Sequence, residues 1–378
     1  MSCSAGNSQS EGQLQPSTSL GPIPPVCPRF QQSTRQALPE RTGSLSEITV
    51  SMKVKSCLNR LKRVLLFFLI LISVGHAFGQ ETSNPRWEFL RTNLDVFPGT
   101  EKLFEPDARL FWRLKPNLKS VRAAERLPDK EFQFSVSTDA KGRRLIPQPA
   151  IARHTVLFLG DSCTFGIPVN DNEAFPALVQ QKTEGIQTIN AGVPGYSAFQ
   201  GRLLLEATDS AFRPEVVVVT FWPNDRSVWD HLGDAEHQEL IAAEQSGEFS
   251  RYRIVRLLRR GTPGKRPRLT DEEFAVQIRQ IVRWCHERGS KPILQIWPVQ
   301  QQMATTDEID RQQILRKIAS EDRVPMVDLV PLFRQRRDAI LFVDSVHATK
   351  EGYTLVADAL VQVIRQELAS KAHPIGHR

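Results

Sequence analysis

Polar side chains suited to hydrolytic chemistry follow apolar segments of this sequence. Ser162 comes after the apolar run 156–159 and the pair Gly160-Asp161. Because the carboxyl ends of parallel strands gather ligands, a nucleophile is expected here, although the tripeptide alone also fits a turn that caps a helix. Further along, Asp344 stands three residues before His347. These types suit nucleophilic catalysis, since an imidazole must accept the serine proton and a carboxylate can fix the imidazole tautomer.

Two more segments place hydrogen-bond donors at expected strand ends. The run 187–190 leads into the glycine-rich turn 191–196, and the run 216–221 leads to Asn224. A tetrahedral intermediate needs fixed donors for its oxyanion, each worth about 3–4 kcal/mol of barrier. Glycine lets the backbone approach closely, and asparagine supplies an N–H group without charge. Every role in acyl transfer to serine therefore has a candidate beside a strand end.

These four blocks, in this order, resemble the SGNH (GDSL-type) hydrolase family over residues 150–370. The resemblance implies that Ser162 is the nucleophile, that His347 is the base and that Asp344 orients the imidazole. It also implies an oxyanion hole made by the backbone N–H groups of Ser162 and Gly192 and the side-chain amide of Asn224. A three-layer α/β/α fold and ester hydrolysis without a metal or organic cofactor are expected with it.

Two positions depart from the simplest pattern. The family's third block usually reads Gly-x-Asn-Asp, but Trp222 stands at the glycine position, where a bulky side chain would narrow the pocket or shift the backbone of Asn224. Cys163 directly follows Ser162, so a thiol nucleophile is conceivable, whereas we expect a buried packing role. An α/β-hydrolase fits less well, because its nucleophile elbow reads Gly-x-Ser-x-Gly and its acid lies well before the histidine.

Alternation of apolar and amphipathic segments predicts the elements that must position these residues. Apolar strands separated by helices indicate right-handed crossovers and a parallel sheet covered on both faces. The strands are expected at 155–159, 186–190, 215–221, 292–297 and 324–329, and the helices at 172–184, 198–212, 271–288, 307–320 and 350–370. Before them, 131–138 alternates polar and apolar residues and runs into the turn 139–142, which predicts a hairpin.

The N-terminal segments are typical of targeting rather than of a fold. A disordered extension is expected at 1–51, because a Ser-, Gln-, Pro- and Gly-rich segment buries too little surface to offset its ordering entropy. Residues 52–79 combine a basic stretch, a short apolar run and small residues, as in a secretory leader cut before Gln80. An uncut N-terminal membrane anchor and a buried helix are the alternatives. Since a leader normally begins a chain, we also expect translation to start at Met52.

Beyond the leader, we expect an N-terminal annex at 80–150 and a hydrolase domain at 151–373. Beyond residue 79 the chain carries 41 Lys and Arg against 39 Asp and Glu, so its charge implies no nucleic-acid partner. The basic stretch 251–268 is expected to be a surface helix with a solvated basic face. The alternative is that this face contacts an anionic glycan or a lipid headgroup. No tight metal-binding motif appears in 225–237.

The sequence therefore predicts an exported serine esterase that removes acyl groups from an oxygen ester. The substrate is expected to be a small-molecule or carbohydrate ester, and membrane contact is expected only through an uncut anchor. An O-acyltransferase with the same triad and a catalytically silent glycan-binding or cell-envelope protein remain alternatives. The acyl length, the alcohol portion, the oligomeric state and the role of residues 80–150 stay open.

Overall fold

The computed structural model describes residues 100–229, 232–246 and 266–370 of the chain. The expected leader and the segments before it therefore lie outside the described residues, as does most of the basic stretch 251–268. None of the helices within the described ranges is long and apolar enough to cross a membrane.

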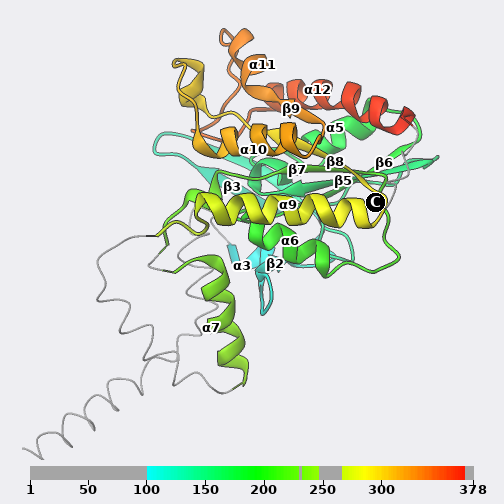
Figure 1. Ribbon diagram of the computed structural model, residues 1–378. Coiled ribbons are helices and arrows are strands. Elements are labelled where there is room, and N and C mark those ends of the chain that lie inside the picture. Colours follow the sequence, from blue (N-terminus) through cyan, green and yellow to red (C-terminus); the bar gives the residue numbers. More distant parts are fainter. Residues whose placement is uncertain (1–99, 230–231, 247–265, 371–378) are drawn as a thin grey trace, which may run out of the picture. The chain divides into compact units, whose positions relative to one another are not determined.

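A five-stranded parallel sheet forms the centre of the fold, in the order β6-β5-β7-β8-β9 (Figure 1). The strands are β5 (His154–Gly160), β6 (Ile186–Gly192), β7 (Val216–Thr220), β8 (Lys291–Ile296) and β9 (Met326–Asp328). All five residues of β7 are buried, as expected for a central strand with helices on both faces. Each strand predicted from the sequence is present, with ends shifted by one or two residues.

Helices pack on both faces of the sheet and complete a three-layer α/β/α arrangement (Figure 1). The longer ones are α5 (Phe175–Gln181), α6 (Ala198–Glu206), α9 (Asp271–Glu287), α10 (Asp310–Glu321) and α12 (Lys350–Ala369). Helices α5 and α12 contact each other on one face, and α9 contacts both α6 and α10 on the other. The predicted fold class is therefore confirmed. The remaining helices are α3 (Thr100–Leu103), α4 (Ser162–Phe165), α7 (Asp234–Ser246), α11 (Leu329–Gln335) and the 3₁₀ turns η1 (Asn224–Arg226) and η2 (Gln300–Met303).

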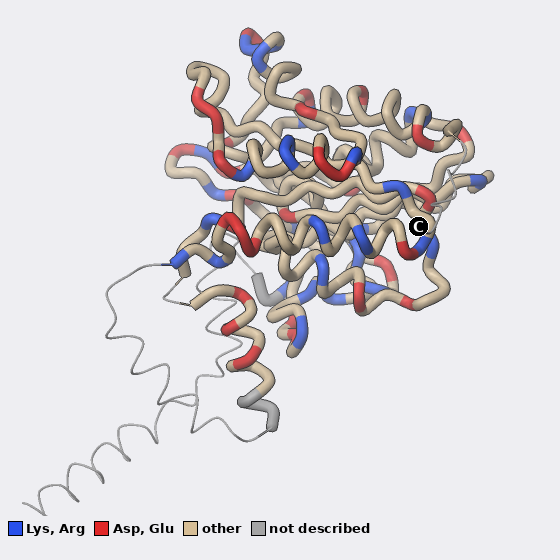
Figure 2. Tube along the Cα trace, viewed as in Figure 1, with Lys and Arg blue, Asp and Glu red and all other residues tan. Residues whose placement is uncertain are grey.

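Helix α9 shows how local sequence sets an element. Thr270 accepts a hydrogen bond from the N–H of Glu273, and the Glu273 side chain reaches back to the N–H of Thr270, so a capping box starts the helix. Apolar residues at helical spacing then face the core, among them Phe274, Ile278 and Ile281. Acidic and basic residues are interspersed along α9 and α10 (Figure 2).

Two antiparallel hairpins precede the parallel sheet. They consist of β1 (Phe104–Asp107) with β2 (Phe111–Leu114), and β3 (Val121–Arg126) with β4 (Glu131–Val136). The sequence placed a hairpin turn after β4, whereas β4 pairs with the strand that precedes it. The Pro128-Asp129 pair in the connecting turn favours this tight reversal, and period-2 alternation does not reveal which neighbour a strand pairs with. The turn at 139–142 is also present, and it leads to an isolated bridge between Thr138 and Arg144.

Both hairpins contribute to the same hydrophobic core as the parallel sheet. Trp112 of β2 is fully buried, and its indole N–H donates to the carbonyl of Pro194 at 3.1 Å. The hydroxyl of Tyr196 donates in return to the Trp112 carbonyl at 2.6 Å. The glycine-rich turn after β6 is therefore fastened to the N-terminal hairpins by two buried hydrogen bonds.

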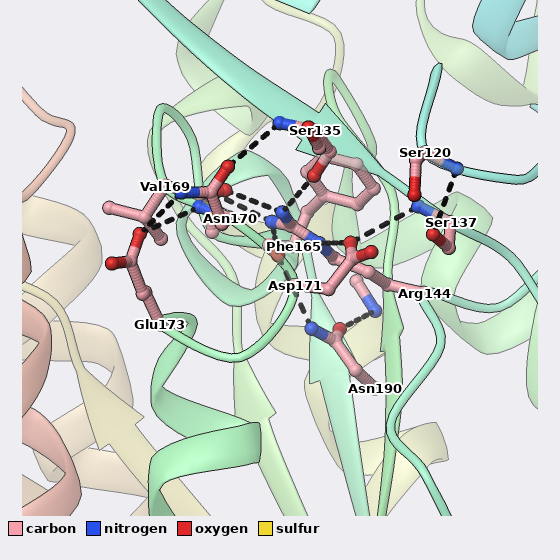
Figure 3. A network of polar contacts seen from close by, with 12 residues as sticks. Ser120, Ser135, Ser137, Arg144, Phe165, Val169, Asn170, Asp171, Glu173 and Asn190 are labelled. Atoms are coloured by element: carbon pink, nitrogen blue, oxygen red, sulfur yellow. Dashed lines mark hydrogen bonds and ion pairs between the residues drawn. The ribbon is translucent and has the colours of Figure 1, made fainter. Parts of the chain in front are cut away.

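Arg144 joins these hairpins to the loop that follows α4 (Figure 3). Its side chain is buried, and its guanidinium donates to the carbonyls of Phe165 and Gly166 at 2.7 and 2.8 Å. It also donates to the carbonyl of Val169 and to the Asp171 carboxylate. Arginine presents five donors in a fixed planar arrangement, so one side chain serves these three carbonyls at once. The carbonyls of Phe165 and Gly166 also accept from Asn190 and Val169, whereas Arg144 is the donor to the carbonyl of Val169 within the described residues.

Replacement of Arg144 by methionine should lower the free energy of unfolding by about 3–5 kcal/mol, because the carbonyl of Val169 loses its donor and the Asp171 carboxylate loses its buried ion-pair partner. Urea denaturation measures this change. Arg143→Met is the matched control, because Arg143 is partly exposed and its ion pair with Asp139 is worth about 0–1 kcal/mol. Equal losses of unfolding free energy in the two variants would show that the buried hydrogen bonds of Arg144 add no more stability than the partly exposed ion pair of Arg143.

Candidate active site

Ser162 stands at the carboxyl end of a central strand, as the first residue of helix α4. Strand β5 ends at Gly160, and Asp161 caps α4 by accepting the N–H of Cys163 at 2.9 Å. A Cβ atom on Gly160 would lie 2.6 Å from the carbonyl oxygen of Thr220 in β7, so the sharp exit from the strand requires glycine. The strand, the cap and the close packing together fix where the half-buried Ser162 hydroxyl lies.

The structure brings Ser162, His347 and Asp344 into one chain of hydrogen bonds. The hydroxyl oxygen of Ser162 lies 2.8 Å from Nε2 of His347. Nδ1 of the same ring lies 2.6 Å from an Asp344 carboxylate oxygen. The other Asp344 oxygen accepts the backbone N–H groups of Val346 and His347 at 2.7 and 2.6 Å. This arrangement can move a proton from the hydroxyl to the imidazole while the carboxylate holds the ring.

The loop that carries His347 is held at both of its ends. Val343 donates its N–H to the carbonyl of His347 at 2.8 Å, and the indole N–H of Trp297 donates to the carbonyl of Val346 at 2.8 Å. Directly after the loop, the Thr349 hydroxyl accepts the N–H of Gly352 and caps α12. The loop that carries the imidazole is thus anchored by Trp297, which follows β8, and by the start of the last helix, α12.

The charges around the imidazole favour its protonated form. Burial works to lower the pKa of His347, but the hydrogen bond with Asp344 and the charges of Asp344, Glu125 and Asp161 raise it above its usual value. Burial also opposes ionisation of Asp344, yet its hydrogen bonds and the nearby imidazole hold the pKa of this carboxyl below its usual value. Asp344 therefore stays ionised and can stabilise an imidazolium as it forms.

Both aspartates that flank the motif residues, Asp161 and Asp225, brace loops. Burial raises the pKa of Asp161 to about 6, and its second carboxylate oxygen accepts the side-chain amide of Asn224 at 3.2 Å. The Asn224 amide donates as well to the carbonyl of Tyr196 at 3.2 Å. Asp225 is buried and accepts the N–H of Ala198 at the start of α6. Asn224 thus lies beside the nucleophile turn, but an oxyanion would have to displace one of its two long hydrogen bonds.

Gly192 occupies a different role from the expected one. Its N–H donates to the side-chain oxygen of Asn190 at 3.0 Å, which corrects the expectation that this N–H is available to an oxyanion. A Cβ atom on Gly192 would lie 2.3 Å from the backbone nitrogen of Phe165, so glycine lets α4 pack directly on β6. Gly195, in the same turn, has φ +79°, and within the described residues its N–H has no acceptor. Gly195 adjoins the Tyr196 carbonyl that Asn224 contacts.

Cys163 and Trp222 are both core residues. The Cys163 thiol is buried, and burial together with the charge of Asp161 raises its pKa well above the usual value, so no thiolate forms at neutral pH. The indole of Trp222 is buried and donates to the carbonyl of Trp297 at 3.0 Å. The large side chain at the position of the family's glycine therefore points into the core.

Glu125 is a site residue that sequence reasoning missed. It comes from β3, its side chain is 4% exposed, and one of its oxygens lies within 4.8 Å of ligand atoms of Asp344 and His347. These three side chains form a group that could in principle ligate a cation, but the imidazole nitrogens already face Ser162 and Asp344. No sequence motif surrounds Glu125, so only the three-dimensional structure reveals that this end of the hairpin lies beside Asp344 and His347.

The model of the GDSL-like lipase/acylhydrolase family matches residues 158–355, which is more than half of the chain. No curated protein sequence was matched.

Several solved structures are similar to the described fold. A lipolytic protein of the G-D-S-L family from Veillonella parvula is 16% identical, with 56% of this chain and 99% of that chain covered and a TM-score of 0.41. The esterase EstA from a Pseudoalteromonas species is 16% identical, with 57% and 100% covered and a TM-score of 0.40. The acetylxylan esterase Axe2 from Geobacillus stearothermophilus is 17% identical, with 60% and 98% covered and a TM-score of 0.39.

The order of the four sequence blocks, the parallel sheet with helices on both faces and the family match lead to one assignment. The chain belongs to the GDSL-like lipase/acylhydrolase family and is an ester hydrolase of the SGNH type.

Proposed function

We propose that this protein is a serine esterase that hydrolyses carboxylic esters through a Ser162–His347–Asp344 triad. The observation that carries the proposal is the unbroken chain of short contacts from the Ser162 hydroxyl through the imidazole to the Asp344 carboxylate. These groups come from opposite ends of the hydrolase region, and their separation matches hydrogen-bond distance at each step. An arrangement of this kind activates a hydroxyl that is otherwise a weak nucleophile.

The reaction proceeds in two halves. Ser162 attacks the ester carbonyl while His347 accepts the hydroxyl proton, and Asp344 stabilises the resulting imidazolium. Collapse of the tetrahedral intermediate breaks the bond to the alcohol, whose oxygen takes the proton from His347, and leaves an acyl group on Ser162. Water then attacks the acyl group, with His347 as the base again, and the acid is released as the Ser162 hydroxyl regains its proton.

The oxyanion of the intermediate requires donors near Ser162. The N–H of Ser162 is one candidate, because the first residue of a helix has no intrahelical acceptor for its N–H group. We propose the N–H of Gly195 as the second donor in place of Gly192, because Gly195 carries the free N–H of this turn. Asn224 completes the set when it exchanges its contact with the Tyr196 carbonyl for the oxyanion.

The proposal extends to location and substrate. The composition of residues 52–79 favours export, with a mature chain that begins at Gln80. N-terminal sequencing of the exported protein checks this, and a retained leader would indicate an anchor instead.

A carbohydrate ester is the proposed substrate. A sugar ring could stack only on exposed indoles, whereas those of Trp112, Trp222 and Trp297 are buried. Other side chains, next to the alcohol portion of the ester, must therefore recognise the sugar.

Ser162→Ala should abolish ester hydrolysis, with a loss of at least about 10³-fold in kcat, because it removes the nucleophile. The matched control is Cys163→Ala, which should retain most of the activity, since the neighbouring thiol is buried and protonated. A serine-reactive phosphonate followed by peptide mass spectrometry should label the wild type at Ser162. The reverse mutational pattern would indicate a thiol enzyme, and an unlabelled, inactive wild type would indicate a silent binding protein.

The pH dependence follows from the direction of the His347 shift. Only the neutral imidazole can accept the proton, so kcat/KM should rise with pH through a pKa above the ordinary 6.5 of histidine. Glu125 and Asp161 also raise the pKa of His347 by their charge. Removal of either charge should therefore move the rising part of the pH profile to lower pH. Steady-state rates on a neutral ester across pH 4–9 measure it, and a limb well below 6.5 in the wild type would contradict the described electrostatics.

A further inference from the structure

Glu125 carries a carboxyl group whose buried oxygen has no hydrogen-bond donor among the residues at 100–229, 232–246 and 266–370. Its side chain is 4% exposed, and its Oε2 atom is buried with no hydrogen-bond partner in the described parts of the chain. Its neighbour Arg126 is exposed and instead binds Glu131, which stands opposite it in the hairpin. A buried carboxyl without a donor costs free energy, so it is expected only where another molecule supplies the donor.

The position of this carboxyl points to the reacting groups. One Glu125 oxygen lies within 4.8 Å of both an imidazole nitrogen of His347 and a carboxylate oxygen of Asp344, yet no hydrogen bond joins Glu125 to either. At a separation of no more than 4.8 Å, a hydroxyl group that donates to Glu125 would also lie close to the imidazole ring. Burial raises the pKa of Glu125 to about 7, so the carboxyl retains oxygen acceptors in both of its protonation states.

The chemistry at His347 identifies which part of a substrate comes this close. In the first half-reaction the imidazole gives its proton to the oxygen of the leaving alcohol, so the alcohol portion must lie beside the ring. A carboxyl next to that ring therefore lies on the side of the alcohol portion, whereas the oxyanion donors bind the carbonyl oxygen of the ester.

We propose that Glu125 is a specificity-determining residue that accepts a hydrogen bond from a hydroxyl group of the alcohol portion of the ester. The preferred substrates are then monoesters of polyhydroxylated alcohols, with a free hydroxyl next to the esterified one, as in partly acylated sugars. This inference rests on the proposed function, and it assigns the N-terminal hairpin β3–β4 to substrate recognition.

The test compares two acetate esters of nearly equal size on the full chain. 2-Hydroxyethyl acetate offers the hydroxyl, and propyl acetate replaces it by a methyl group. The wild type should show the higher kcat/KM for 2-hydroxyethyl acetate. Glu125→Leu should lower the ratio of the two kcat/KM values by about 10- to 100-fold, as expected for loss of a hydrogen bond to a charged acceptor, because any effect through the charge on His347 is common to both esters and cancels in the ratio.

A control on the same hairpin is Glu131→Leu, which removes an exposed carboxylate and should leave the ratio unchanged. Glu125→Met provides a second apolar variant if the leucine variant does not fold. Because Glu125 has no hydrogen-bond donor to lose among the residues that the structure describes, both apolar variants should keep the thermal midpoint of the wild type or raise it, whereas a purely structural glutamate would lower it.

The outcomes separate the two proposals. If Glu125→Leu slows both esters equally, the carboxylate acts only through its charge on His347, and the recognition role is wrong. An unchanged ratio in active Glu125 variants overturns it as well. A wild type that releases acetate from neither ester, and is not labelled by the phosphonate, contradicts the proposed function itself.

Discussion

The hydrogen bond between the Ser162 hydroxyl and Nε2 of His347 is the contact on which the rest of the structure depends. Its two partners are 185 residues apart in the sequence and meet at the carboxyl edge of the parallel sheet. Strand β5 and the Asp161 cap place the hydroxyl, while the loop before α12 places the imidazole. Neither half of the fold contains a functional site by itself, because each supplies one side of a proton transfer that works only at hydrogen-bond distance.

The N-terminal hairpins are part of this site rather than an appendage. Arg144 binds the carbonyls of the loop after α4, and Trp112 and Tyr196 fasten the turn that follows β6. Glu125 then adds a carboxyl group beside the imidazole. The hairpins therefore support the loops on which the catalytic groups stand and also contribute a side chain of their own to the alcohol side of the site.

The strands of the sheet and the block containing Ser162 could be predicted from the sequence because buried apolar runs and strand-end motifs are local signals. The partner of β4 could not, since alternation marks a strand without marking its neighbour. Gly192 was misjudged for a related reason: only the three-dimensional packing shows that its N–H meets Asn190. No sequence motif surrounds Glu125. Its importance depends on its burial, which the sequence does not reveal, because a polar residue in an alternating strand is normally expected on the exposed face.

The glycines at the strand ends have a consequence for protein engineering. A Cβ atom at Gly160 or Gly192 would collide with backbone atoms of neighbouring segments, so α4 rests directly on the sheet with no intervening side chains to trim or enlarge. Substitutions at that edge would displace the nucleophile before they reshaped any binding surface. Redesign of substrate range should therefore begin with the hairpin side chains, where variation leaves the backbone contacts beneath the serine untouched.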